Sequence, residues 1–208
     1  MTQQHQNLDP KLVVLISGSG SNLQALIDAV ERKMLKARIC AVISNKATAY
    51  GLTRAESAGI STLTFPYKPF KEQGREAYDA ALAKQVAQFQ PDLIILAGWM
   101  RIFTPSFLDA FPNRVINLHP ALPNSYIGAH GIDWAWQAWE KGEIEKTGCM
   151  VHMATAELDR GPVIESAVVP FRQNEPRDLF EKRLHQAEHQ LIVSATKKML
   201  GTIYATNN

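Results

Sequence analysis

The sequence predicts an α/β fold in which a doubly wound, mostly parallel sheet carries helices on both faces. Short apolar runs alternate along the chain with longer stretches whose apolar residues recur at helical spacing. The apolar runs are unbroken, which is typical of parallel strands that are buried on both faces. Crossovers between such strands are right-handed, and ligands of the resulting Rossmann-like layer bind beyond the carboxyl ends of the strands.

The first half of the chain contains most of the predicted parallel strands. The expected strands cover residues 11–16, 38–44, 60–65 and 93–98, and the helices cover residues 23–34, 49–58 and 78–89. A glycine-rich and serine-rich turn over 17–22 joins the first strand to the first helix. Gly59 and Pro91 end the second and third helices, because glycine and proline both stop helices.

The pattern of the second half of the chain differs from that of the first and predicts the remaining elements. The expected elements are a short helix over 105–110, a strand over 115–118, a loop over 121–131, a tryptophan-rich helix over 132–141, and strands over 147–155 and 162–170. The last two strands predict one reversed pair near the C-terminal part. A C-terminal amphipathic helix is expected to begin near Asn174 as its N-cap. We expect one domain over 1–208, with a flexible tail over 1–10.

Composition excludes several classes of protein. With 46% hydrophobic residues and a net charge of +2, the chain predicts a sizeable core and no basic stripe for nucleic acid. It has no apolar run that could cross a membrane and no secretory signal. Cys40 and Cys149 lack a CxxC spacing and predict reduced thiols in a cytoplasmic protein. Monomer and homodimer both stay open.

The sharpest functional signal lies where the strand over 115–118 ends at Pro120. Asn117 and His119 are two positions apart, so their side chains point to the same side of a strand. An amide and a histidine that face one spot can together hold an oxyanion. Asp159 is the candidate carboxylate, because opposite charge favours the protonated imidazolium. If the fold brings these three residues together, they indicate acyl transfer.

Each of these signals has a simpler interpretation. The turn over 17–22 fits a single phosphate at a helix N-terminus, but it also fits a tight turn without a ligand. His119 fits a core histidine, and Asp159 fits a turn residue. His130 and His152 lack the spacing of metal ligands, so no metal is predicted, and whether either assists catalysis stays open.

Two further acidic residues, Glu157 and Glu188, each allow more than one interpretation. Glu157 is a rival to Asp159, although two positions away it should face elsewhere on an extended segment. His185 and Glu188 are three positions apart on the last helix, and their spacing alone suggests a solvated pair.

Five stretches of the chain, in order, resemble the glycinamide ribonucleotide formyltransferase family, which is folate-dependent and serves purine synthesis. These stretches are VLISGSGSNLQ (14–24), SNK (44–46), LAGWMRI (96–102), NLHP (117–120) and ELDRGPVI (157–164). They span nearly the whole chain, and five in order is a specific match. The resemblance implies two small-molecule substrates, glycinamide ribonucleotide and 10-formyltetrahydrofolate, and catalysis by Asn117, His119 and Asp159.

The resemblance also implies the binding residues. Gly20, Ser21 and Asn22 are similar to the backbone cradle for the ribonucleotide phosphate, and Glu188 matches a position that contacts the ribonucleotide. The positions that resemble the folate site, where backbone groups recognise the pterin ring, are Arg75, Met100, Arg101, Ile102 and Phe103. The expected reaction is a direct attack of the amine on the formyl carbon. Asn117 and protonated His119 hold the resulting oxyanion.

The loop over 120–131 departs from the family pattern. The family usually continues His-Pro-Ser-Leu-Leu-Pro, then an aromatic residue, proline and glycine. Here Pro123 replaces a leucine, and Asn124 and Ile127 replace prolines. We therefore expect a different shape or mobility of this loop, and its substrate contacts do not carry over.

Three alternatives use parts of the same pattern. A hydrolase of the same folate donor would replace the amine by water, but such relatives carry an extra N-terminal domain, whereas about ten residues precede the first strand. A tRNA formyltransferase would need an RNA-binding domain and a basic face. A non-catalytic phosphometabolite-binding module would keep the turn at Gly20 and have no use for the three catalytic residues.

Overall fold

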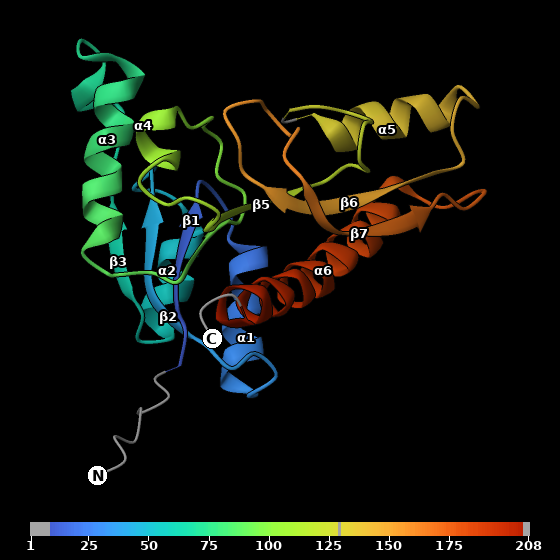
Figure 1. The fold of residues 1–208 in the computed structure, drawn as a ribbon. Helices are drawn as coiled ribbons and strands as arrows, with labels where there is room; N and C mark the ends of the chain where they lie inside the picture. The colour runs from blue at the N-terminus through green and yellow to red at the C-terminus, as the bar shows by residue number, and fades with distance from the viewer. Residues whose placement is uncertain (1–8, 129, 206–208) are drawn as a thin grey trace.

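Unbroken apolar runs form the centre of a seven-stranded sheet in the computed structural model, which describes residues 9–128 and 130–205 (Figure 1). The strands are β1 (Lys11–Ile16), β2 (Arg38–Ser44), β3 (Ser61–Thr64), β4 (Leu93–Leu96), β5 (Val115–His119), β6 (Lys146–Met153) and β7 (Val163–Pro170). Their order is β3-β2-β1-β4-β5-β6-β7. The first five are parallel, and β6 is antiparallel to both neighbours, which confirms the predicted reversed pair.

Helices cover both faces of the sheet, as the doubly wound pattern predicts (Figure 1). The helices are α1 (Ser21–Glu31), α2 (Tyr50–Ser57), α3 (Gly74–Ala87), α4 (Pro105–Leu108), α5 (Gly131–Glu140) and α6 (Arg177–Ala205), with a 3-10 turn, η1 (Lys68–Phe70). One apolar cluster joins α1, α2, α5 and α6 to the sheet, and a second joins α3 and α4 to it. None of the helices that the structure describes has an apolar stretch long enough to cross a bilayer.

Some predicted boundaries are wrong, and local chemistry explains them. The C-terminal helix begins at Arg177, not near Asn174, because Asn174 adopts a left-handed conformation with φ of 59° in a turn before the helix. The first helix ends at Glu31, so Met34 is 55% exposed and lies outside its apolar face. The tail expected over 1–10 falls mainly on residues 1–8, which are outside the described residues.

The chain order of the sheet reverses between β1 and β4, and ligands of such sheets bind at this point. The turns that follow the two strands are hydrogen-bonded to each other, because the Ser17 N–H donates to the Gly98 carbonyl at 3.0 Å. The next strand, β5, pairs in parallel with β4 and ends at the same edge. The fold therefore brings the three turns that the sequence singled out to one place.

Gly20 shapes the turn between β1 and α1. It is the N-cap of α1 and has a φ of 71°, in the left-handed region. A Cβ atom at Gly20 would lie only 2.6 Å from the Cα atom of Gly51, at the start of α2. The Gly51 N–H also donates to the Gly18 carbonyl at 3.1 Å, so two backbone segments touch here. Glycine is required at position 20 both for conformation and for space.

We expect Gly20→Ala to destabilise the protein by about 3 kcal/mol, because the methyl group adds overpacking to the cost of a left-handed alanine. Gly59→Ala is the matched control, since Gly59 has a φ of 69° and open space around its Cβ position. That variant should cost only about 1 kcal/mol. Urea unfolding measures both values. An equal loss of stability in the two variants would show that the approach to Gly51 is not limiting.

Candidate active site

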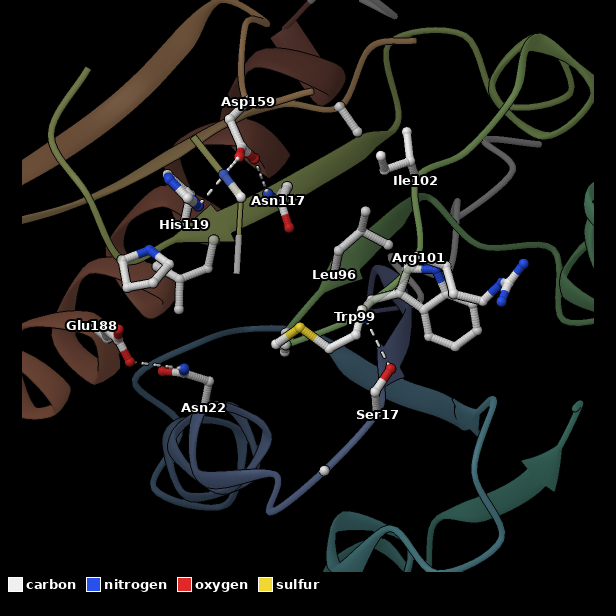
Figure 2. A pocket seen from close by; sticks show the side chains of 18 of the residues that line it. Ser17, Asn22, Leu96, Trp99, Arg101, Ile102, Asn117, His119, Asp159 and Glu188 are labelled. Atoms are coloured by element: carbon white, nitrogen blue, oxygen red, sulfur yellow. Dashed lines mark hydrogen bonds and ion pairs between the residues drawn. The ribbon is translucent and has the colours of Figure 1, made fainter. Parts of the chain in front are cut away.

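The carboxyl ends of β1, β4 and β5 open into a cavity of about 670 Å³ (Figure 2). Of the residues assigned to a site from the sequence, those that line the cavity are Gly20, Ser21, Asn22, Met100, Arg101, Ile102, Phe103, Asn117, His119, Asp159 and Glu188. Arg75 is exposed and contacts the wall from outside. The cavity therefore unites segments from both halves of the chain.

His119 and Asp159 meet although they are far apart in the sequence (Figure 2). His119 is the last residue of β5, and Asp159 lies in the turn between β6 and β7. The distance between His119 Nδ1 and Asp159 Oδ2 is 3.5 Å, and each side chain is only 5% exposed. Because little water screens these two atoms, the electrostatic interaction between the ring and the carboxylate is stronger than at the surface. The predicted convergence of the two side chains is therefore present.

Asn117 completes the group through a partner that the sequence left open. Asn117 on β5 lies directly opposite His152 on β6, and Asn117 Nδ2 is 3.1 Å from His152 Nε2. The same Nδ2 donates to Asp159 Oδ1 at 3.4 Å. His152 Nδ1 is 2.9 Å from the Met153 carbonyl oxygen, and His152 Nε2 is also 3.6 Å from Asp159 Oδ1. His152 is therefore a direct contact of Asn117 and not a distant core residue.

The Asp159 carboxylate is held in place by its own backbone and by its neighbours. Asp159 has a φ of 53°, a conformation that aspartate adopts more readily than most residues. The Gly128 N–H donates to Asp159 Oδ2 at 2.9 Å. Burial favours a higher pKa of the carboxyl, but the hydrogen bonds from His152 and Gly128 and the charges of His119 and His152 together lower the pKa below 3.8. Asp159 is therefore an anion at neutral pH.

His119 also contacts the loop over 120–131. Its Nε2 is 2.6 Å from the carbonyl oxygen of Tyr126. Oxygen acceptors thus face both ring nitrogens, and only an imidazolium can donate to both at once. In this structure the N–H groups of Asn117 and His119 that were predicted to hold an oxyanion already donate to protein acceptors. The loop that departs from the family pattern supplies one of these acceptors.

The end of the cavity at α1 has the features of an anion site. Ser21 and Asn22 form the first turn of α1, whose N-terminus carries free N–H groups and positive potential. Asn22 Nδ2 donates to Glu188 Oε2 at 3.2 Å. Glu188 is 4% exposed and accepts at 3.0 Å from His185 Nδ1, so the interpretation as a solvated pair is wrong. This hydrogen bond raises the pKa of His185 against the opposing effect of burial.

The opposite wall is the segment after β4. The Met100 N–H donates to Ser17 Oγ at 2.9 Å, and Arg75 Nη2 donates to the Ile102 carbonyl at 2.8 Å. The Arg101 guanidinium stacks on the Tyr67 ring at 3.9 Å and points away from Asp159 (Figure 2). This wall therefore presents mainly backbone groups and apolar side chains to the cavity.

Several residues that line the cavity were not assigned to a site from the sequence, and three of them carry polar groups that bear on binding. Ser17, Lys46 and His185 all lie in its wall. The order of the turns at the sheet edge could have suggested Ser17, and the SNK stretch could have suggested Lys46. His185 was noted only for its spacing from Glu188, because its place in the cavity wall depends on how α6 packs beside α1.

Two other candidates lie apart from the site. His130 is 68% exposed and pairs with Asp133, and Glu157 is exposed outside the cavity lining. Within residues 9–128 and 130–205, no group of three or more histidine, cysteine, aspartate or glutamate side chains is arranged to hold a metal ion. The acidic and imidazole groups of the cavity are instead paired with one another.

Comparison with known proteins places the chain among formyltransferases. The family model described as "Formyl transferase" matches residues 10–196. The chain is 43% identical over 199 residues to "Phosphoribosylglycinamide formyltransferase" of Schizosaccharomyces pombe, covering 91% of this chain and 96% of that relative. It is 41% identical over 181 residues to "Trifunctional purine biosynthetic protein adenosine-3" of Drosophila melanogaster, covering 86% of this chain and 13% of that protein. The crystal structure of glycinamide ribonucleotide transformylase 1 from Symbiobacterium toebii is similar with a TM-score of 0.85 and 37% identity, covering 95% of this chain and 90% of that one.

We expect Asp159 to contribute to stability at neutral pH and to lose that contribution in acid. Its pKa is lowered by folding, so the unfolded chain binds a proton first as the pH falls. The contribution is therefore complete above about pH 5 and disappears as the pH falls below about 4 and through the folded pKa. Urea unfolding of the wild type and Asp159→Asn between pH 3 and pH 7 measures the difference. A difference that stays constant across this range would contradict the assignment.

Proposed function

The chain belongs to the formyl transferase family, and from this premise we propose that it transfers the formyl group of 10-formyltetrahydrofolate to the amine of glycinamide ribonucleotide. It is a folate-dependent formyltransferase of purine biosynthesis, in keeping with the names of its relatives. We further infer that both substrates are small molecules and that the enzyme works in the cytoplasm. The free thiols of Cys40 and Cys149 support that compartment.

One observation carries the catalytic part of the proposal. A buried imidazole and carboxylate, His119 and Asp159, stand 3.5 Å apart in the wall of a single cavity that also contains an anion site. Formyl transfer needs positive charge where the carbonyl oxygen becomes negative, and an imidazolium held by a carboxylate supplies it. A module that only binds a phosphometabolite has no need of this pair.

The two ends of the cavity fit the two substrates. The phosphate of glycinamide ribonucleotide is assigned to the N-terminus of α1 at Gly20, Ser21 and Asn22. Glu188, buried beside Asn22, is assigned to the hydroxyl groups of the ribose. A carboxylate is unsuited to hold the phosphate itself, because like charges repel.

The formyl donor is assigned to the segment after β4. Its pterin ring presents several hydrogen-bonding groups on a flat edge, and Met100, Arg101, Ile102 and Phe103 offer backbone groups outside regular secondary structure. Arg75 reaches this segment through the Ile102 carbonyl. With the donor on this wall and the ribonucleotide at α1, the reacting atoms meet beside Asn117, His119 and Asp159. Holding both reactants in one cavity supplies the entropic part of the rate.

The reaction proceeds by direct attack. The amine nitrogen bonds to the formyl carbon, and the carbonyl electron pair moves onto oxygen. His119 and Asn117 donate to this oxyanion while Asp159 keeps the imidazolium in place. One amine proton then passes through water and Asp159 to the leaving nitrogen of the folate, and the bond from carbon to that nitrogen breaks. The products are formylglycinamide ribonucleotide and tetrahydrofolate, and no group is transferred to the enzyme.

The contact between His119 Nε2 and the Tyr126 carbonyl sets a condition on this reaction. The formyl oxygen needs the N–H that the Tyr126 carbonyl now accepts. We infer that the loop over 120–128 shifts when both substrates bind, so that the formyl oxygen takes the place of the carbonyl. The same movement frees the Gly128 N–H from Asp159, which leaves that carboxylate available to accept a proton.

We expect the purified protein to consume 10-formyltetrahydrofolate only when glycinamide ribonucleotide is present. The measurement is the absorbance change on formation of tetrahydrofolate, with a control that lacks the amine. Equal turnover in the control would identify a hydrolase and refute the proposed transfer to the amine. A formyl group found covalently on the enzyme by mass spectrometry would contradict direct attack.

We expect His119→Ala to lower kcat by about 100-fold to 1000-fold, because it removes the cationic donor for the oxyanion. Binding of glycinamide ribonucleotide, measured by calorimetry, should stay close to the wild-type value. His130→Ala is the matched control, since His130 is exposed and outside the cavity lining. The control variant should keep the wild-type kcat. A His119 variant with unchanged kcat would remove the imidazole from the mechanism.

A further inference from the structure

The wall assigned to the formyl donor has little support from its own backbone. Residues 97–104 link β4 to α4, and 99–103 belong to neither a helix nor a strand. In the described part of the chain, no backbone–backbone hydrogen bond involves residues 99–103. Such a segment keeps its N–H and C=O groups available for a ligand, but other groups must then fix its shape. Those groups are side chains.

Three side chains hold the segment at successive points. Ser17 accepts from the Met100 N–H, and Arg75 donates to the Ile102 carbonyl. At the far end, Asp79 Oδ2 accepts from the Thr104 N–H at 2.7 Å and from the Thr104 hydroxyl at 2.8 Å. Thr104 directly precedes α4, so this double contact fixes the point where the segment ends.

Asp79 differs from Arg75 because it is buried. Asp79 is 1% exposed, whereas Arg75 is an exposed residue. A buried carboxylate is costly unless hydrogen bonds satisfy it, and bonds to an ionised acceptor are stronger than bonds between neutral groups. Arg75 and Asp79 are one turn apart on α3, so this helix holds the segment at two points. Asp79 supplies the rigid point.

We propose that Asp79 is a positioning residue for the formyl donor, which acts by fixing Thr104 and through it the backbone of Met100, Arg101 and Ile102. This inference rests on the proposed function, because it concerns the wall assigned to the folate. Asp79 itself does not line the cavity, so its effect is transmitted through the segment. The other end of the cavity is built from α1 and α6, which Asp79 does not contact through any hydrogen bond in the described residues. The inference therefore predicts a defect toward one substrate only.

The test compares Asp79→Asn with the wild type in steady-state kinetics toward each substrate. We expect KM for 10-formyltetrahydrofolate to rise about tenfold, which corresponds to about 1.4 kcal/mol. KM for glycinamide ribonucleotide and kcat at saturation should stay near the wild-type values. A merely structural role would lower the amount of folded enzyme without separating the two KM values.

Asp92→Asn is the matched control. Asp92 Oδ2 accepts from the Lys11 N–H at 2.7 Å, which is the same kind of bond at the opposite edge of the sheet. Both variants should therefore unfold at lower urea concentration, and only the Asp79 variant should change the ratio of the KM values. Thr104→Ser keeps both donors and should retain the wild-type ratio. Thr104→Val removes the hydroxyl and should change the ratio in the same direction as Asp79→Asn.

The outcomes separate this inference from the proposed function. An equal rise of both KM values in Asp79→Asn, or no rise in either, would overturn the inference while leaving the transferase activity of the wild type established. If the wild type lacks that activity, calorimetry with tetrahydrofolate as the probe still tests whether Asp79 positions the folate wall. Weaker binding to Asp79→Asn than to Asp92→Asn supports the positioning role, and equal binding refutes it. If Asp79→Asn does not fold, Thr104→Val against Thr104→Ser gives the same comparison.

Discussion

The Asp159 carboxylate is the point on which the site depends, because three other segments of the chain meet it there. Asn117 and His119 arrive from β5, His152 from β6, and the Gly128 N–H from the loop that follows β5. Each contact neutralises part of a negative charge that burial would otherwise make costly. The reversed strands β6 and β7 carry Asp159 to this place. Without them the edge of the parallel sheet would still offer a turn and a helix N-terminus, but no anion would face His119.

The two ends of the cavity differ in their chemistry. The end at α1 and α6 combines a helix N-terminus with the buried Glu188, which suits a phosphorylated sugar. The end at α3 and α4 offers an irregular backbone segment held by side chains, which suits a flat heterocycle. The point where the strand order reverses lies between the two ends. One cavity can therefore hold two chemically different substrates side by side.

The local pattern of apolar and polar residues predicted much of the fold. It could not predict the contacts that depend on how distant segments pair. The strands β1 and β2 match their predicted bounds, because unbroken apolar runs define them. Strand periodicity placed Asn117 and His119 on one side of the strand, and the family resemblance added Asp159 to them. The contact between Asn117 and His152 depends on the register of β5 and β6, which no local pattern fixes. Asp79 gave no signal, because an acidic residue on a helix usually faces water.

The contact of His119 with Tyr126 is made by a main-chain oxygen, and this has a consequence for how the enzyme can vary. Exchange of the side chain at position 126 leaves the oxygen in place, whereas exchange of backbone-restricting residues such as Pro123 would alter the path of the loop that carries it. Substitutions in the loop can therefore change how readily the Tyr126 carbonyl moves away from His119, and with it the rate of turnover. The side chains that react with the substrates stay the same.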